Sequence, residues 1–169
     1  VDIVRQAITE KGRRIEKVVE AAYISGDKPL YKVATDRFLT LLLLQDELLG
    51  TRPEFKVGNW IQQARSIAHT PEEKDLYEWN ARVQITTWGN RNAADDGGLR
   101  DYSHREWGGM LKDFYYPRWK AWFEVLQARL DGKEAVNIDW YAMEEPWTHL
   151  QNEYPVTPQS DPVAMAKEV

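Results

Sequence analysis

The sequence predicts an all-α fold, a single bundle-like domain of about six helices with one long glycine-rich loop. Three observations support this prediction. Apolar residues recur at spacings of three and four, the helical period, and strand-like alternation is confined to the short run RVQIT. Proline and glycine separate the periodic stretches. The length of 169 residues suits one domain, and no internal repeat is visible.

The first half of the chain divides at turns that contain proline and glycine. A helix is expected over about residues 3–22, ended by the turn SGDKP. A second helix, over about residues 29–49, contains the run FLTLLLL, whose apolar side chains on nearly every side predict a central, mostly buried element. Pro53 then opens a third helix, which continues through Ile67.

The next helix has the clearest start signal in the sequence. In TPEE, Thr70 supplies an N-cap hydroxyl, Pro71 takes the first helical position and Glu73 closes a capping box. This helix is expected to run to Trp88 and to stop at Gly89. The polar segment that follows, GNRNAADDGGLRD, is long for a connection in a compact helical domain, and such loops are more often functional or mobile than structural.

The last third of the chain predicts two further helices and an irregular tail. Ser103 and Glu106 form a second capping box, which opens a helix that Pro117 kinks or divides. Asn137 is expected to cap the last long helix. The proline-spaced end from Pro155 is expected to wrap the surface before a short PVAMAKE turn.

Composition and charge narrow the classes of partner and site. The net charge is -5 and the basic residues are dispersed, so we expect no nucleic-acid partner. The most apolar run is too short for a membrane span. Cysteine is absent and the three histidines are scattered, so no metal site or cofactor is predicted. A nucleophile elbow, a phosphate loop and an acid–base carboxylate pair are also missing, so the chain alone lacks the residues of a complete enzyme.

The stretch DLYEWNARVQITTWG combines aromatic rings with amide and guanidinium groups. On a continuous helix, one face carries Tyr77, Asn80 or Ala81, Gln84 and Trp88. A neighbouring face, assigned to the core, carries Leu76, Trp79 and Val83. Sugars are bound by such combinations, because the apolar face of a pyranose lies on an aromatic ring while amides pair with its hydroxyls. On spacing alone, helix packing with the amides at a wet rim is the more frequent explanation.

Four blocks of the sequence resemble the C-terminal helical domain of α-N-acetylglucosaminidases, a glycoside hydrolase family with lysosomal and bacterial members. The blocks are LLLLQDELLGTRPEFKVGNWIQQAR, TPEEKDLYEWNARVQITTWG, LRDYSHREWGGMLKDFYYPRWKAWFE and YPVTPQSDPVAMAKE. They follow one another in order over nearly the whole chain. NARVQITTWG and LRDYSHREWGGMLKDFYYPRW are the most specific, and the bacterial members are the more similar.

The resemblance implies that residues 1–169 form the C-terminal domain of a larger enzyme with a catalytic (β/α)8 barrel upstream. Such enzymes are exo-acting retaining hydrolases that remove terminal α-linked N-acetylglucosamine with two glutamates. Both glutamates would belong to the barrel, so no residue of this chain is assigned a catalytic role, and the fragment alone is expected to be inactive. The implied partners are the barrel and the glycan, and the implied location in a bacterium is secreted or periplasmic.

The resemblance also implies that the domain borders the substrate pocket. Trp88, before the long loop, is the leading candidate for a pocket wall. The further substrate-binding candidates are Tyr77, Asn80, Arg82, Gln84, Arg100, Asp101 and Tyr102. The turn after Trp88 contains Asn90 where family members commonly have proline, so contacts of residues 90–98 are not carried over.

Alternatives stay open for single residues and for the whole chain. Arg100 and Asp101 could instead form a buried structural pair. Packing and support of the helix kink are the roles assigned to Trp107, Arg118 and Trp119. The chain could also be a free-standing helical protein-interaction module, or a glycan-binding module without catalysis. The natural glycan and the oligomeric state do not follow from the sequence.

Overall fold

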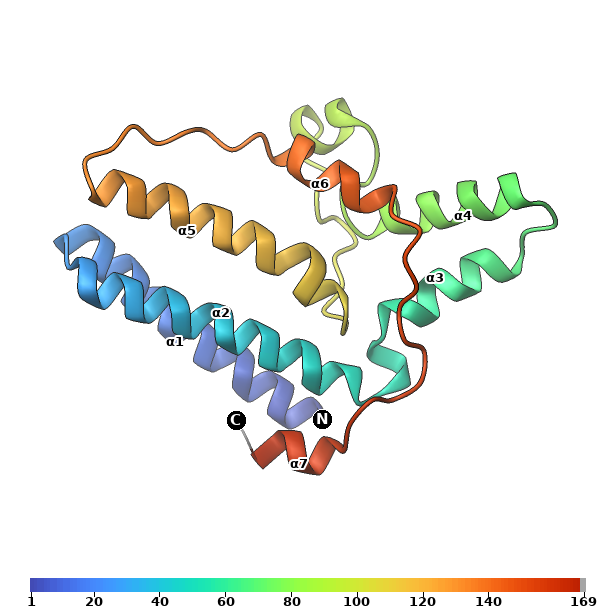
Figure 1. The fold of residues 1–169 in the computed structure, drawn as a ribbon, viewed down its shortest axis with the longest axis horizontal. Helices are drawn as coiled ribbons and strands as arrows, with labels where there is room; N and C mark the ends of the chain where they lie inside the picture. The colour runs from blue at the N-terminus through green and yellow to red at the C-terminus, as the bar shows by residue number, and fades with distance from the viewer. Residues whose placement is uncertain (168–169) are drawn as a thin grey trace.

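The structure, a computed structural model, describes residues 1–167, and over this range the fold is all-α, as predicted (Figure 1). No strand is present there beyond an isolated bridge between Lys56 and Gly108. The helical elements are α1 (Asp2–Ser25), α2 (Lys28–Gly50), η1 (Pro53–Phe55), α3 (Val57–Ser66), α4 (Pro71–Gln84), η2 (Asn92–Asp96), η3 (Leu111–Tyr115), α5 (Tyr116–Leu130), α6 (Trp140–Thr148) and α7 (Pro162–Lys167). The expected PVAMAKE turn is α7, apart from Glu168, which lies outside the described residues.

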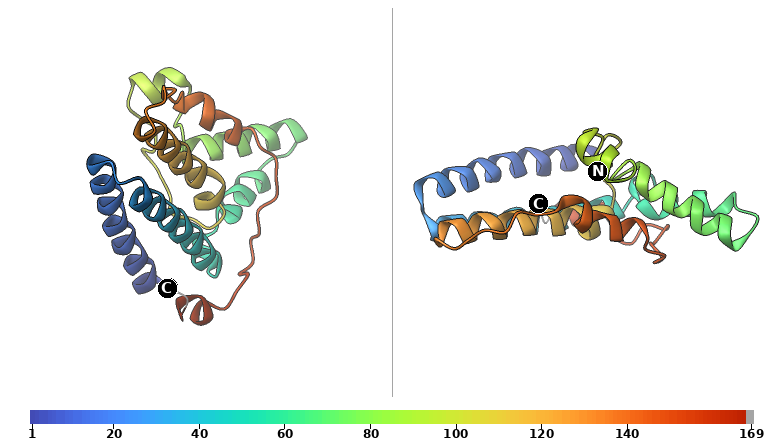
Figure 2. Two further views of the ribbon diagram at one scale, coloured as in Figure 1. Left: turned by 60° about the vertical axis from the view of Figure 1, so that its left-hand side comes forward. Right: turned by 90° about the horizontal axis from the view of Figure 1, so that it is seen from above.

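The first lobe consists of α1, α2 and α5. Gly26 ends α1 with a φ of 74°, and the chain reverses there into α2. α5 lies along α2, and α1 lies on one side of the layer that α2 and α5 form (Figures 1 and 2). A hydrophobic cluster joins the three helices through Val19, Ala22, Tyr31, Ala34 and Phe123. The hydroxyl of Tyr31 donates to the carbonyl oxygen of Phe123 at 2.9 Å, which fixes α5 on α2.

The leucine run of α2 is less buried than the sequence predicts. Leu41, Leu48 and Leu49 are buried, but Leu42 to Leu44 are only half-buried. α2 contacts α1 and α5 on two sides, which leaves part of its circumference uncovered in this domain.

The second lobe is built on α3 and α4, which form a hairpin that extends away from the first lobe (Figure 1). The predicted start of α4 is confirmed: the Thr70 side chain accepts from the Glu73 backbone N–H at 3.2 Å, and the Glu73 carboxylate accepts from the His69 N–H at 2.7 Å. The core of this lobe consists of Val57, Ile61, Ile85, Met110, Phe114 and Trp147. The assignment of Leu76 and Trp79 to the core was wrong, because both side chains are exposed.

Three predicted boundaries were wrong, the first two because tertiary contacts replace the local signal and the third because a neighbouring residue caps the helix instead. α4 ends at Gln84, four residues before Trp88. Residues 104–107 are not helical, and Glu106 accepts from the Gln45 amide at 3.3 Å instead of closing a capping box. Helix α6 is capped by Asp139 rather than Asn137, since its carboxylate accepts from the Ala142 N–H at 3.0 Å.

A strap formed by residues 149–161 crosses from α6 over α3 to the first lobe, as the predicted surface-wrapping tail (Figure 1). Gly58 allows this crossing, because a Cβ atom there would lie 2.6 Å from the carbonyl oxygen of Pro155. Beyond the strap, Met165 of α7 packs with Ile8, Leu41 and Leu48. The strap thus links the two lobes.

Candidate functional site

Trp88 and Tyr102, which flank the glycine-rich segment between α4 and η3, form an exposed aromatic pair. Their ring centroids are 5.1 Å apart and the ring planes are tilted by 53°. Trp88 is 37% exposed and Tyr102 is 72% exposed. Leaving large aromatic surface in water gives up burial energy that a purely structural residue would recover. The pair is therefore the leading candidate for contact with a ligand.

The backbone beneath the pair is held in an uncommon conformation. Trp88 and Asp101 have φ values of 62° and 61°, and they are the two non-glycine residues with positive φ in the described range. The Asp101 N–H donates to the carbonyl oxygen of Thr86 at 2.9 Å, and the Trp88 N–H donates to Val83 at 2.8 Å. Such conformations cost roughly 1–3 kcal/mol each and cluster at functional sites. Two residues with positive φ in one hydrogen-bonded region therefore indicate a functional site rather than an ordinary loop.

The glycine-rich segment between the two rings is folded. It contains the π-helical turn η2, which the Asn90 side chain begins by accepting from the Ala93 N–H at 3.1 Å. Ala94 is buried, and the Arg91 guanidinium donates to the Asp139 carboxylate at 2.7 Å. The predicted glycine-rich loop thus contains a short helical turn, and these contacts fix it on α6.

An ion-pair frame lies behind the aromatic pair, centred on Glu144 of α6. This carboxylate is 1% exposed and lies 2.7 Å from Nε of Arg100 and 3.0 Å from Nε of Arg118. Arg118 also donates to both carboxylate oxygens of Asp101, at 2.8 and 3.0 Å, while Arg100 pairs with Asp95. The sequence left open a direct pair between Arg100 and Asp101. The structure instead pairs each of them with other residues. They are joined through Arg118 and Glu144.

Burial governs the electrostatics of this frame. Burial raises the pKa of Glu144 above its ordinary value, even though Arg118 and Arg100 act to lower that pKa. Oε1 of Glu144 pairs with Arg118 by charge but accepts no aligned hydrogen bond. Burial, followed by the charge of Asp101, raises the pKa of Tyr115, so its hydroxyl stays protonated and donates to Asp101 at 3.3 Å. The frame holds Asp101, and with it the backbone of the neighbouring Tyr102.

The other predicted site residues lie elsewhere. Tyr77, Asn80 and Gln84 line an open groove between α3 and α4, together with Trp60, Gln63, Ala64, Ile67 and Ala81, and Trp88 is not among the lining residues. The single face expected from a continuous helix is thus divided, because α4 ends at Gln84.

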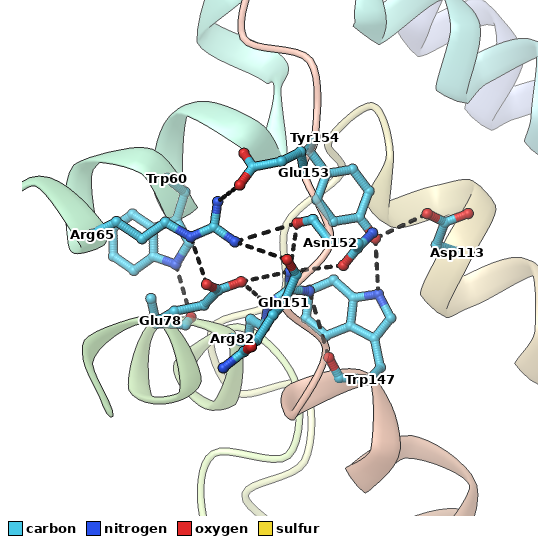
Figure 3. A network of polar contacts seen from close by, with 11 residues as sticks. Trp60, Arg65, Glu78, Arg82, Asp113, Trp147, Gln151, Asn152, Glu153 and Tyr154 are labelled. Atoms are coloured by element: carbon cyan, nitrogen blue, oxygen red, sulfur yellow. Dashed lines mark hydrogen bonds and ion pairs between the residues drawn. The ribbon is translucent and has the colours of Figure 1, made fainter. Parts of the chain in front are cut away.

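Arg82 is fully buried, with no exposed surface for a ligand. It donates to Glu78 at 2.8 and 3.0 Å and to the side chain of Asn152 in the strap at 3.0 Å (Figure 3). Glu78 also accepts from Arg65 of α3. The structure gives Arg82 the task of holding the strap on the α3–α4 hairpin.

Sequence reasoning missed Glu144, the residue that joins the frame. A signal was present, because Glu144 lies four residues after Trp140 and three before Trp147, on the apolar face of a short helix. A carboxylate at such a position needs a buried cation. Its partners, 44 and 26 residues away, could not be identified from spacing. Within residues 1–167, no group of three acidic or histidine side chains is arranged to hold a metal ion, and none of the helices combines the length and apolarity needed to cross a bilayer.

Comparisons with known proteins agree over the whole chain. Residues 1–169 match the model of the α-N-acetylglucosaminidase C-terminal domain. Human α-N-acetylglucosaminidase is 29% identical over 175 residues, which cover 100% of this chain and 23% of that protein. A family 89 glycoside hydrolase from Clostridium perfringens, solved in complex with PUGNAc, is 42% identical with a TM-score of 0.93, over 99% of this chain and 20% of that one.

A second Clostridium perfringens structure holds the substrate GlcNAc-α-1,4-galactose. It is also 42% identical to this chain, with a TM-score of 0.92, over 98% of this chain and 20% of that one. The chain therefore spans less than a quarter of the length of these relatives.

Proposed function

The chain belongs to the family of α-N-acetylglucosaminidase C-terminal domains, and we propose that it serves as the helical domain of a family 89 glycoside hydrolase. In this proposal the domain packs on an upstream catalytic (β/α)8 barrel and forms part of the wall of the substrate pocket. The whole enzyme removes terminal α-linked N-acetylglucosamine, and its two catalytic carboxylates belong to the barrel. The domain alone is inactive, and the enzyme is secreted or periplasmic.

The exposed Trp88–Tyr102 pair carries this proposal. An indole and a phenol ring tilted against each other form a shallow apolar corner, on which the C–H face of a pyranose can pack. The relative that was solved with GlcNAc-α-1,4-galactose supports a sugar as the ligand. The two left-handed residues and the Thr86–Asp101 hydrogen bond hold both rings in place before substrate arrives, which lowers the entropic cost of binding.

Asp101, Arg100, Arg118 and Glu144 act as positioning residues in this proposal. Their charges are largely satisfied by one another, so they fix the backbone that carries Tyr102 and take no part in the reaction. Uncharged rings at the pocket wall and a rigid ionic frame behind them suit a neutral amido sugar.

The test uses the whole enzyme with Trp88→Ala and, separately, Tyr102→Ala. We expect kcat/KM for a chromogenic α-N-acetylglucosaminide to fall tenfold or more in Trp88→Ala, which corresponds to about 1.4 kcal/mol of transition-state binding. Trp79→Ala is the matched control, because Trp79 is also exposed but stacks on His149 instead. Circular dichroism verifies the fold of each variant. If Trp88→Ala retains the activity of Trp79→Ala, the pair packs at a domain interface and the proposed pocket wall is wrong.

A further inference from the structure

A cavity of about 360 Å³ lies beside the ionic frame, between α5, α6 and the residue before Tyr102. Its lining consists of Trp119, Trp122, Trp140, Tyr115, Arg118 and Asp101. Neither Trp88 nor Tyr102 lines it, so it is separate from the aromatic pair. Its volume falls within the range of small-molecule sites, roughly 300–1,000 Å³. Three of the eight tryptophans of the chain converge on this one cavity.

The indole N–H groups around the cavity have no acceptor in the described part of the chain. By contrast, Nε1 of Trp60 donates to the carbonyl oxygen of Ala81 at 2.8 Å, and Nε1 of Trp147 donates to the hydroxyl of Tyr154 at 3.2 Å. An indole N–H can only donate, so each free one favours a ligand that carries acceptor oxygens. Unpaired indole N–H groups also occur elsewhere in residues 1–167, so this half-open cavity is distinguished by the three tryptophans that converge on it.

The charge of the lining excludes two ligand classes. A box of aromatic rings attracts organic cations through the π faces of the rings, but the Arg118 guanidinium already lies over the ring of Trp140, with its Cζ 6.0 Å from the ring centroid. An anion is disfavoured as well, because Arg118 is already neutralised by Asp101 and Glu144. The ligand that remains is neutral, has an apolar face for the indoles, and carries hydroxyls that can both donate to Asp101 and accept from Arg118.

We propose that this cavity, the tryptophan pocket, is a second carbohydrate site that binds a neutral pyranose independently of catalysis. One sugar face packs on Trp122 and Trp140, and the hydroxyls reach the Asp101–Arg118 pair. Because Asp101 lines the tryptophan pocket while the adjacent Tyr102 belongs to the aromatic pair, the two sites are neighbours. The tryptophan pocket does not depend on the proposed function, since no residue of the aromatic pair touches its ligand.

The test is a titration of the ¹⁵N-labelled 169-residue chain with methyl α-N-acetylglucosaminide and with galactose, followed through the indole N–H signals. We expect the signals of Trp122 and Trp140 to shift with a dissociation constant of about 1–10 mM, a weak single-sugar affinity. Trp60 and Trp147 are internal references, because their N–H groups are bonded inside the protein. Tetramethylammonium and sulfate are the charged comparison compounds.

Variants assign the shifts to the tryptophan pocket. Trp122→Ala should weaken sugar binding at least tenfold, whereas Trp79→Ala, at 38% exposure against 37% for Trp122, should leave it unchanged. Trp88→Ala should also leave it unchanged, which separates this test from that of the pocket wall. The proposal is overturned if no indole shifts, if only the charged compounds cause shifts, or if Trp122→Ala binds as the wild type does. The same titration of the whole polypeptide, labelled with 5-fluorotryptophan, must also shift the tryptophan signals. If no signal shifts, another domain fills the cavity, and the proposal is overturned.

Discussion

Replacing Glu144 with alanine should destabilise the domain by about 3 kcal/mol and disturb the aromatic pair that Glu144 does not touch. Removing one partner of a buried ion pair typically costs 3–5 kcal/mol, because the remaining charge is left without compensation. Arg100 and Arg118 are each about one-fifth exposed and keep Asp95 and Asp101 as partners. Water and these carboxylates relieve part of the cost, which places the expected loss at the lower end of that range, about 3 kcal/mol.

Urea unfolding followed by circular dichroism measures this loss. With a slope of about 2 kcal/mol per molar urea, the midpoint should fall by about 1.5 M without a change in slope. Glu145→Ala is the matched control, because the Glu145 side chain is 47% exposed and makes only long contacts, to the Tyr141 hydroxyl at 3.4 Å and to His149 at 4.0 Å. Glu145→Ala should cost less than about 0.5 kcal/mol.

The conservative variant Glu144→Gln separates positioning from stability. Glutamine keeps an acceptor for Arg100 but removes the charge, so we expect it to recover part of the stability and part of the kcat/KM of the whole enzyme. If Glu144→Ala unfolds within 1 kcal/mol of Glu145→Ala, the ionic frame does not hold this region, and the account of how Asp101 and Tyr102 are positioned is wrong.

Three further predictions concern the rest of the fold. Burial raises the pKa of Asp46 from 3.8 to about 6, so the folded state binds this proton more tightly than the unfolded state does; stability from this group is present below about pH 4 and lost as the pH rises to about 6, by roughly 3 kcal/mol. Asp46→Asn should remove this pH dependence. If the free energy of unfolding changes by the same amount between pH 4.5 and 7 in both proteins, the prediction is wrong. Arg82→Ala should cost about 3–5 kcal/mol in urea unfolding, because Glu78 loses a fully buried partner; a loss below 1 kcal/mol refutes the role of this network. Gly58→Ala should lower the thermal midpoint, because its Cβ would lie 2.6 Å from the strap backbone. Gly12→Ala should raise the midpoint by stiffening α1, because the nearest side-chain atom is 3.8 Å away. Equal midpoints for the two variants would show that the strap shifts freely.

The sequence predicts the features that depend on neighbouring residues. The Thr70 cap is an example, since its hydroxyl, Pro71 and Glu73 all act within one turn. The helical period likewise identified the all-α class. In each case the interaction that decides the structure is written in a few adjacent residues.

Features that depend on distant partners were not predictable from spacing. Helix α4 stops at Gln84 because the following turn folds back on Val83 and receives Asp101 from 15 residues beyond Thr86. Arg82 looks like a ligand-binding arginine until the strap, 70 residues later, covers it. A mixed aromatic and polar helix can serve either a surface or a buried network, and the choice depends on which distant segment packs on it.

The strap also sets an order of events during synthesis on the ribosome. The α3–α4 hairpin leaves the exit tunnel well before residues 151–154, yet Arg65 needs Glu153 at 2.6 Å and Arg82 needs Asn152 at 3.0 Å, partners 88 and 70 residues away. Until those residues emerge, the nascent hairpin carries two arginines and one carboxylate without their full set of partners. The hairpin is therefore completed only after the strap has been synthesised, and pairing over such sequence distances slows folding. A premature stop codon before residue 151 would leave a chain with nearly all of its helices and an unfinished second lobe, a substrate for chaperones and proteases.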